Sequence, residues 1–235
     1  MRLLLLSNST NAGEPYLDYC KEYIKSFLGT KTVKALFIPY AGVVISFDDY
    51  SKRVNERFEE TGHRIDPIHN HPDPIKAVRD AEAIVVGGGN TFQLIRHIQD
   101  NKLIEIVRKK VLAGTPYIGW SAGANVACPT ICTTNDMPIL QPQSFNAFNL
   151  VPFQINPHYL DVNPEGHSGE TREARIEEYI KVNKDKYVVG LREGTLLRIE
   201  NGKQELVGKR NARIFHYGMN PIEIKPGEDI SLYFD

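Results

Sequence analysis

The sequence has few cysteines and no excess of charge of either sign. Its 235 residues include three cysteines, Cys20, Cys128 and Cys132, and an odd number without a framework spacing argues against a disulfide-stabilised secreted domain. The 28 Lys and Arg residues nearly balance the 29 Asp and Glu residues, so the formal net charge is −1. A nucleic-acid partner is not expected, because neutralising phosphates requires a clustered excess of cations.

Long hydrophobic runs are also missing. The run Leu3–Leu6 is too short for the apolar part of a signal peptide, and the polar segment from Asn8 to Glu14 follows it without a small-residue cleavage site. No segment approaches the roughly 20 apolar residues that cross a bilayer. We therefore expect a cytoplasmic protein with no membrane partner and with free thiols.

The first two thirds of the sequence alternate between short apolar runs and segments with helical spacing. The expected strands are Leu3–Leu6, Val33–Ile38, Arg64–His69, Ala83–Val86 and Pro116–Gly119, and the expected helices are Tyr16–Phe27, Asp48–Glu60, Pro74–Asp80, Phe92–Val111 and a small-residue helix from Ala122. This alternation predicts an α/β fold, with a mostly parallel sheet and helices on both of its faces.

The rest of the sequence has a different pattern. Residues 129–151 have no strong period and are expected to form a loop-rich excursion over one end of the sheet. The expected elements beyond them are a helix at Thr171–Val182 and strands at Phe153–Asn156, Tyr187–Leu191, Leu196–Ile199, Glu205–Val207, Arg213–Tyr217, Ile222–Ile224 and Ile230–Phe234. Asn201-Gly202 is a strong hairpin signal. We expect residues 194–235 to form an antiparallel appendage on a single domain that spans residues 1–235.

The segment Gly119-Trp120-Ser121-Ala122-Gly123 matches the pattern of a nucleophile elbow. An elbow needs a strand, a turn so sharp that only small residues fit beside the serine, and then a helix. Tyr117-Ile118 provides the strand and the small residues after Ser121 begin the helix. A strained backbone would hold the Ser121 hydroxyl clear of the sheet, whereas the alternative is a tight turn in which Ser121 only caps the helix.

Consecutive glycines at Gly87–Gly89 follow the strand Ala83–Val86. The dinucleotide-binding pattern fails because Phe92 stands where its third glycine belongs. Glycines at a strand end can instead present free backbone N–H groups to a developing negative charge. A plain tight turn is the alternative, but the neighbouring Ser121 favours an oxyanion site. Asn90, directly after this turn, is expected to contact the substrate.

A serine nucleophile needs a base and an acid that orients the base. His158 directly follows the strand Phe153–Asn156 and Pro157, so we expect it beyond the carboxyl ends of the same sheet as Ser121. His167 and His216 are less well placed. Two acids remain open, because Glu193 follows the strand Tyr187–Leu191 and Asp136 lies between the serine and the histidine in the chain. The position at a strand end favours Glu193.

Several segments together resemble the peptidase E family of serine peptidases, family S51. They are Leu3–Thr10, Ile38–Val43, Val86–Leu94, Ile118–Asn125, Thr133–Pro138, Ile155–His158 and Pro164–Glu173. The resemblance runs from the N-terminus to about Glu193 and is looser beyond it. It implies a glutamine-amidotransferase-like α/β fold, hydrolysis of dipeptides with an N-terminal aspartate, and no metal or other cofactor.

Residue roles carry over from this resemblance by position. It implies that Ser121 is the nucleophile, that His158 is the general base and acid, and that the N–H groups of Gly89 and Ala122 form the oxyanion hole. For the acid, the family pattern includes both open positions and does not decide between them. It also implies that Arg172 recognises the substrate aspartate. Without the resemblance, the helix that begins there would be interpreted as a surface helix with charge pairs.

The family pattern has proline where this sequence has Arg192. A cation at this position could lower the pKa of Glu193 or draw its carboxylate away from His158.

The expected function is that of a serine dipeptidase that acts on small Asp-Xaa peptides through an acyl-enzyme. Two alternatives stay open: a cyanophycinase-like hydrolase of aspartyl–arginine polymer, and a binding module without enzymatic activity. The sequence does not distinguish a monomer from a homodimer.

Overall fold

The structure is a computed structural model that describes residues 1–163, 166 and 169–234. The strands are β1 (Leu3–Leu6), β2 (Lys34–Ile38), β3 (Arg64–Pro67), β4 (Ile84–Val86), β5 (Tyr117–Trp120), β6 (Gln154–Tyr159), β7 (Tyr187–Arg192), β8 (Thr195–Glu200), β9 (Lys203–Gly208), β10 (Ala212–His216) and β11 (Ile222–Ile224). The helices are α1 (Lys21–Leu28), α2 (Phe47–Glu60), α3 (Pro74–Asp80), α4 (Thr91–Asp100), α5 (Leu103–Leu112), α6 (Ala122–Asn125) and α7 (Arg172–Val182), with 3-10 helices η1 (Ile68–Asn70) and η2 (Ile230–Tyr233).

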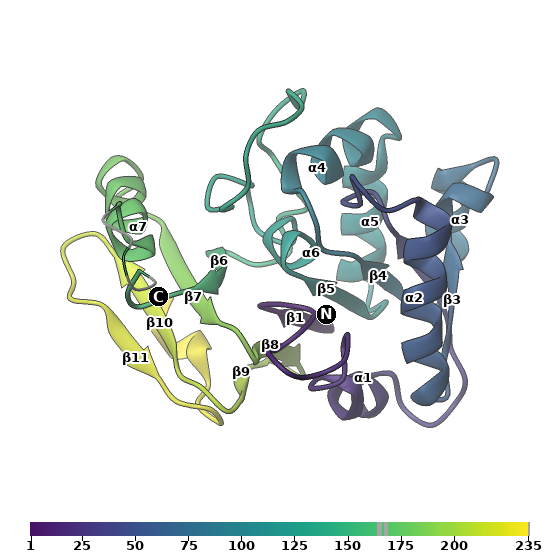
Figure 1. Ribbon diagram of the computed structural model, residues 1–235, viewed down its shortest axis with the longest axis horizontal. Coiled ribbons are helices and arrows are strands. Elements are labelled where there is room, and N and C mark those ends of the chain that lie inside the picture. Colours follow the sequence, from purple (N-terminus) through teal and green to yellow (C-terminus); the bar gives the residue numbers. More distant parts are fainter. Residues whose placement is uncertain (164–165, 167–168, 235) are drawn as a thin grey trace.

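The strands form two sheets, which Figure 1 shows side by side. The larger sheet has the order β3-β2-β4-β5-β1-β8-β9, in which the strands from β3 to β1 are parallel and β8 and β9 are antiparallel. The predicted α/β class, with a mostly parallel central sheet, is confirmed. The carboxyl ends of β1, β2, β4 and β5 lie at one edge of this sheet, so the segments that follow these strands meet there.

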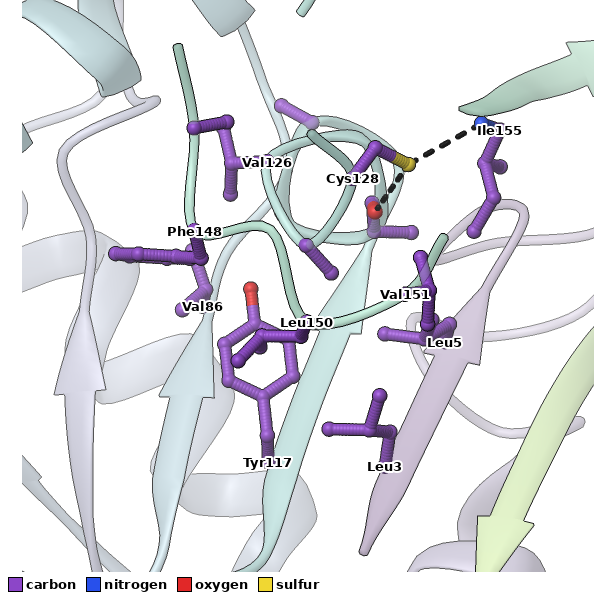
Figure 2. Packing of buried hydrophobic residues seen from close by; sticks show 14 of the residues in the cluster. Leu3, Leu5, Val86, Tyr117, Val126, Cys128, Phe148, Leu150, Val151 and Ile155 are labelled. Carbon is purple, nitrogen blue, oxygen red and sulfur yellow. Dashed lines mark hydrogen bonds between the residues drawn. The ribbon is translucent and has the colours of Figure 1, made fainter. Parts of the chain in front are cut away.

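Both faces of the central sheet are buried, as the continuous apolar runs predict. Leu3 and Leu5 belong to the apolar cluster on one face with α3, α4, α5 and α6, and Leu4 and Leu6 to the cluster on the other face with α1 and α2. Figure 2 shows the first of these clusters, where Leu5 and Tyr117 lie beneath α6. The sheet therefore holds its strand ends rigidly.

The smaller sheet has the order β11-β10-β7-β6, with β6 and β7 parallel to each other. Its α7 packs on one face through Ile176 and Ile180, which contact Val188 and Phe215. The expectation that His158 follows a strand of the same sheet as Ser121 is wrong, because β8 occupies the free edge of β1 and leaves β6 and β7 to pair separately. The antiparallel C-terminal strands are accordingly divided between the two sheets.

Several element boundaries differ from the prediction. The first helix begins at Lys21 instead of Tyr16, because Leu17 has a left-handed φ of 55° and its N–H donates to Ser9 O. The predicted helix Phe92–Val111 is two helices, which Lys102 separates with a φ of 57°.

The last predicted strand, Ile230–Phe234, is instead the 3-10 helix η2. Asp229 caps the N-terminus of this helix. The Asn201-Gly202 hairpin between β8 and β9 is confirmed, with left-handed φ values of 55° and 79°. Among the described residues, no helix is both long and apolar enough to cross a membrane.

Candidate active site

Ser121 lies at the tip of β5, in the strained turn that the elbow pattern predicts. Its φ is 52° and its ψ is −113°, a conformation that residues with a Cβ rarely adopt. A Cβ on Gly119 would lie 2.3 Å from Gly123 O, and a Cβ on Gly123 would lie 2.1 Å from Val86 O. The turn therefore requires both glycines. The Ser121 hydroxyl makes no capping bond to α6, so the alternative of a capping serine is wrong.

The glycine turn after β4 lies directly against Ser121. A Cβ on Gly88 would be 3.0 Å from Ser121 Cβ, and a Cβ on Gly89, whose φ is 137°, would be 2.2 Å from Ala41 O. In the described part of the chain, neither the Gly89 N–H nor the Ala122 N–H donates a hydrogen bond. Two unpaired donors beside a hydroxyl can stabilise an oxyanion.

His158 connects Ser121 to Glu193 through its two ring nitrogens. Nε2 lies 2.9 Å from Ser121 Oγ, and Nδ1 lies 2.7 Å from Glu193 Oε1. Because an ionised carboxylate only accepts hydrogen bonds, Nδ1 carries the ring proton, and Nε2 is free to accept from the hydroxyl. The ring can therefore take the Ser121 proton while Glu193 holds its orientation.

The backbone at His158 is irregular in a way that the sequence did not reveal. His158 has a φ of 54° and lies inside β6, where the register with β7 shifts between Asn156 and Tyr159. The buried Ser7 hydroxyl fills this irregularity, because it accepts from the His158 N–H at 2.9 Å and donates to Leu191 O at 2.8 Å. Ser7 thereby joins the segments that carry His158 and Glu193.

Asn8 holds the other side of the same turn. Its Oδ1 accepts from the N–H of Gly194, the residue after Glu193, at 2.9 Å. The backbone N–H of Ser7 also donates to Thr195 O at 3.0 Å. The end of β1 therefore fixes the turn between β7 and β8 from two successive residues.

Asp136, the second acid that the sequence left open, makes different contacts. Its Oδ2 accepts from the Thr91 N–H at 2.7 Å and from the Thr91 hydroxyl at 2.6 Å, at the N-terminus of α4. Asn90 caps that helix with Oδ1 and donates from Nδ2 to Met137 O at 2.9 Å. Asp136 and Asn90 thus hold the loop 129–151 against α4, and the carboxylate at the His158 ring is that of Glu193.

Arg172 begins α7 and lies half-buried near the His158 segment. Its Nη1 donates to Asn135 Oδ1 at 2.7 Å, and Asn135 Nδ2 donates to Pro157 O at 2.7 Å. Burial lowers the pKa of the Arg172 guanidinium, which still stays charged at neutral pH. Arg172 is not among the described residues that line the cleft at Ser121.

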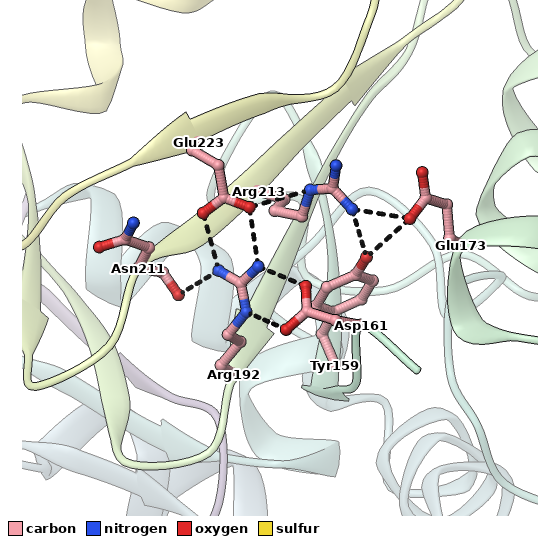
Figure 3. Close-up of polar contacts among 7 residues, drawn as sticks. All are labelled: Tyr159, Asp161, Glu173, Arg192, Asn211, Arg213 and Glu223. Carbon is pink, nitrogen blue, oxygen red and sulfur yellow. Dashed lines mark hydrogen bonds and ion pairs between the residues drawn. The ribbon is translucent and has the colours of Figure 1, made fainter. Parts of the chain in front are cut away.

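Arg192 does not draw Glu193 away from His158, contrary to one expectation from the sequence. Its guanidinium binds both oxygens of Asp161 and both oxygens of Glu223, and Arg213 joins the network through Glu223 at 3.1 Å (Figure 3). Hydrogen bonding to Arg192 lowers the pKa of both acids. The network ties the chain beyond β6 to the end of β7 and to β11.

A cleft of about 520 Å³ opens at Ser121. It is lined by residues of β5, β6 and α2, of the loop 129–151 and of the segments that follow β1, β2, β4 and β5: Ser9, Tyr16, Ala41, Gly42, Val43, Val44, Ile45, Tyr50, Arg53, Gly88, Gly89, Asn90, Trp120, Ser121, Asp136 and His158. Tyr50 supports the glycine turn, because its hydroxyl donates to Gly88 O at 2.9 Å and accepts from Trp120 Nε1 at 3.1 Å. The sequence reasoning missed Ser7, Tyr50 and Arg53.

Of the two other histidines considered as bases, the structure describes His216. His216 lies in β10, stacked on Tyr187 at 4.2 Å between ring centroids. His167 lies outside the described residues. Within the described ranges, no three His, Cys, Asp or Glu side chains are grouped as a metal site.

The chain is similar in sequence to known peptidases. Residues 3–207 match the family model described as peptidase family S51. A curated protein from Nostoc sp. named "Peptidase E" is 50% identical over 234 residues, which cover 100% of this chain and 97% of the relative. "Peptidase E" from Shewanella denitrificans is 44% identical over 230 residues, with coverages of 98% and 97%.

Solved structures of other peptidases have a similar fold. A putative peptidase E protein from Listeria monocytogenes EGD-e matches with a TM-score of 0.66 at 21% identity, covering 88% of this chain and 98% of that chain. A peptidase from an acI-B1 Actinobacterium matches with a TM-score of 0.72 at 20% identity, covering 97% and 96%. These identities show the shared fold, and the family assignment rests on the closer sequences. The chain therefore belongs to peptidase family S51 and is a serine-type peptidase.

Proposed function

We propose that the protein hydrolyses dipeptides with an N-terminal aspartate through an acyl-enzyme on Ser121. The observation that carries the proposal is the continuous set of contacts from the Ser121 hydroxyl through the His158 ring to the Glu193 carboxylate, 2.9 Å and 2.7 Å long. This arrangement, beside unpaired backbone donors, supports acyl transfer as the reaction class.

In the first half of the reaction, His158 Nε2 takes the proton of the Ser121 hydroxyl as Oγ attacks the aspartyl carbonyl carbon. The carbonyl oxygen becomes the oxyanion of a tetrahedral intermediate. The N–H groups of Gly89 and Ala122 donate to it, and the positive end of α6 adds to the field. When the C–N bond breaks, the imidazolium of His158 gives its proton to the leaving amine.

In the second half, water attacks the ester carbon while His158 takes one of its protons. Collapse of the second tetrahedral intermediate breaks the ester bond, and the proton returns to Ser121 Oγ. Glu193 remains ionised and stabilises the imidazolium in both halves. Both halves therefore use the same three side chains, and the enzyme returns to its starting state when the second half is complete.

The preference for aspartate is assigned to Arg172. A guanidinium forms paired hydrogen bonds with a carboxylate, and a half-buried one gains more from such a pair than an exposed one does. Asn135 joins Arg172 to the backbone at Pro157, one residue from His158. This connection supports a place for the aspartyl side chain on the β6 side of Ser121. A site that pairs a substrate charge rejects substrates without it strongly.

The test compares two dipeptides that differ at the first residue. Purified protein is expected to cleave Asp-Leu and to leave Leu-Leu intact. Ser121→Ala is expected to abolish turnover while its circular dichroism and melting temperature stay near those of the wild type. Arg172→Gln is expected to lower kcat/KM for Asp-Leu by at least about 100-fold, in line with the loss of a charge-assisted pair.

Each outcome has a separate meaning. Equal cleavage of Asp-Leu and Leu-Leu would contradict the role of Arg172 and leave the serine chemistry intact. Full activity of Ser121→Ala would contradict the mechanism. Cleavage of aspartyl–arginine polymer without cleavage of the free dipeptide would contradict the dipeptidase proposal and favour the polymer hydrolase.

A further inference from the structure

The cleft at Ser121 continues past the nucleophile toward α2. This far part is lined by Tyr16, Arg53 and the segment Val43–Ile45. Val44 is fully exposed and Val43 is about half exposed, so an apolar rim borders a cationic side chain. None of these residues has a part in the chemistry at Ser121 described above.

Arg53 has no counter-charge among the residues that the structure describes. Its guanidinium lies 4.1 Å from the centre of the Tyr16 ring. In the described ranges, no carboxylate forms an ion pair with it, whereas Arg57, one turn further along α2, binds both Asp18 and Glu60. A guanidinium held on an aromatic face keeps its N–H groups free for an anion.

The aromatic platform under Arg53 is connected to the oxyanion turn. The Tyr16 hydroxyl donates to the Tyr50 hydroxyl at 3.4 Å, and the Tyr50 hydroxyl donates to Gly88 O. The Tyr16 ring also packs edge-on against Trp120, with centroids 6.4 Å apart. Arg53 is therefore supported by residues whose positions are fixed relative to Ser121.

The helices that carry Arg53 and Arg172 lie on opposite sides of the elbow. Arg53 is on α2 and Arg172 is at the start of α7, and Figure 1 shows these two helices apart, with β5 and α6 between them. A dipeptide of aspartate and a second residue carries two carboxylates, one on the aspartyl side chain and one at the C-terminus. They lie on opposite sides of the scissile bond.

We propose that Arg53 binds the C-terminal carboxylate of the leaving residue, with Val43 and Val44 against the side chain of that residue. The inference rests on the proposed dipeptidase function and adds the subsite on the leaving-group side. It makes the free C-terminus a specificity determinant. Chains longer than a dipeptide would place an uncharged peptide group at Arg53 and lose this contact.

The test uses three substrates that share the aspartyl residue: Asp-Leu, Asp-Leu amide and aspartyl p-nitroanilide. Arg53→Gln is expected to lower kcat/KM for Asp-Leu about tenfold, the effect of losing one partly exposed charge-assisted hydrogen bond. It should leave the amide and the anilide within about twofold of the wild type, because neither carries the carboxylate. Arg53→Lys keeps the charge and is expected to recover most of the activity toward Asp-Leu.

Lys52→Gln is the matched control. It removes one positive charge from the neighbouring position of α2, and Lys52 does not line the cleft at Ser121. Its kcat/KM values for the three substrates should stay at the wild-type level. A fall for Asp-Leu equal to that of Arg53→Gln would reduce the effect to overall charge and overturn the proposal.

Two further results would also overturn it. An equal loss on all three substrates for Arg53→Gln would place Arg53 on the aspartyl side or in the structure. No loss on any of them would show that Arg53 does not form the subsite.

A binding measurement tests the role of Arg53 without turnover. Ser121→Ala should bind Asp-Leu about tenfold more tightly than the amide by calorimetry, and adding Arg53→Gln should abolish that difference. A wild-type protein that cleaves none of the substrates contradicts the proposed function, and the binding comparison still decides the role of Arg53.

Discussion

The two sides of the active site are held in place by different physical means. Ser121 and the glycine turn sit at the ends of parallel strands whose side chains are buried on both faces. Close backbone approaches at Gly119, Gly123 and Gly89 leave no room for a Cβ. His158 lies in β6 of the smaller sheet, at a register shift, and Glu193 directly follows β7. Both positions depend on hydrogen bonds from the distant residues Ser7 and Asn8.

This difference predicts two kinds of sensitivity. The Ser121 side should tolerate no added volume, because the backbone itself would have to move. The His158 side should tolerate volume better and respond to the loss of polar partners, since each buried donor or acceptor left without a partner costs about 1–3 kcal/mol. Substitutions on each side can separate these responses.

Among the substitutions that compare the two sides, Glu193→Gln is expected to have the largest effect on activity. The amide keeps the shape of the side chain and loses the charge that stabilises the imidazolium, so kcat should fall about 10³–10⁴-fold. Asp136→Asn is the matched control, because Asp136 contacts Thr91 rather than the His158 ring. Steady-state kinetics that show the larger loss in Asp136→Asn would contradict the assignment of Glu193.

Gly123→Ala is expected to have the largest effect on stability. The new Cβ would lie 2.1 Å from Val86 O, and the resulting backbone shift should lower the free energy of unfolding by more than about 3 kcal/mol. In Gly202→Ala the new Cβ meets nothing within 4 Å, and the left-handed conformation alone should cost about 1 kcal/mol. Urea denaturation of both variants measures the difference, and equal losses would contradict the steric account.

The Ser121 side was also the easier one to predict. The elbow and its glycines are adjacent in the sequence, so a local pattern identified them. Its strands were predicted nearly to the residue because their apolar runs are continuous. Helix boundaries failed where Leu17 and Lys102 adopt left-handed backbone conformations, which the helical spacing of their neighbours concealed.

The His158 side could be predicted only in part. The position of Glu193 at a strand end correctly favoured it as the neighbour of the ring, although the strands belong to a second sheet. Ser7 could not be found, because it is 151 residues from His158 and 184 residues from Leu191 in the chain. A local sequence pattern does not show that a hydroxyl bridges two strands that occur much later in the chain.

Ser7→Ala, on the His158 side, is expected to have effects of intermediate size on stability and on activity. The variant removes the buried Ser7 hydroxyl and leaves the half-buried His158 N–H without its acceptor, so we expect stability to fall by about 1–3 kcal/mol and kcat by about tenfold, with KM unchanged. A fall in kcat without a change in KM would show that the base is misplaced during the chemical step. Ser26→Ala, at an exposed hydroxyl that donates only to Tyr23 O, is the control and should match the wild type in both measurements.

Arg192→Gln is expected to have the smallest effect on the free energy of unfolding, and this effect depends on pH. Because Arg192 lowers the folded pKa of Asp161 and Glu223, the unfolded chain binds more protons than the folded chain below about pH 4.5. The stabilisation is therefore present at neutral pH and is lost as the pH falls through the folded pKa values. We expect the variant to be less stable than the wild type by about 1–2 kcal/mol at pH 7, and we expect this difference to shrink as the pH falls from 5 to 3.

Denaturation curves at pH 7, 5 and 3 measure this dependence. Arg96→Gln, which breaks the exposed pair of Arg96 with Asp100, is the control and should change stability by less than about 0.5 kcal/mol at each pH. A stability difference for Arg192→Gln that persists unchanged at pH 3 would contradict the role of these ion pairs.

Mass spectrometry after reaction with a fluorophosphonate probes the central claim most directly, since an activated serine reacts with it and an ordinary serine does not. We predict a single label on the peptide that contains Ser121 in the native protein, and no label in His158→Gln or in the urea-unfolded wild type. A catalytically active preparation that stays unlabelled at Ser121, or an equal label in His158→Gln, would show that the imidazole does not activate this hydroxyl.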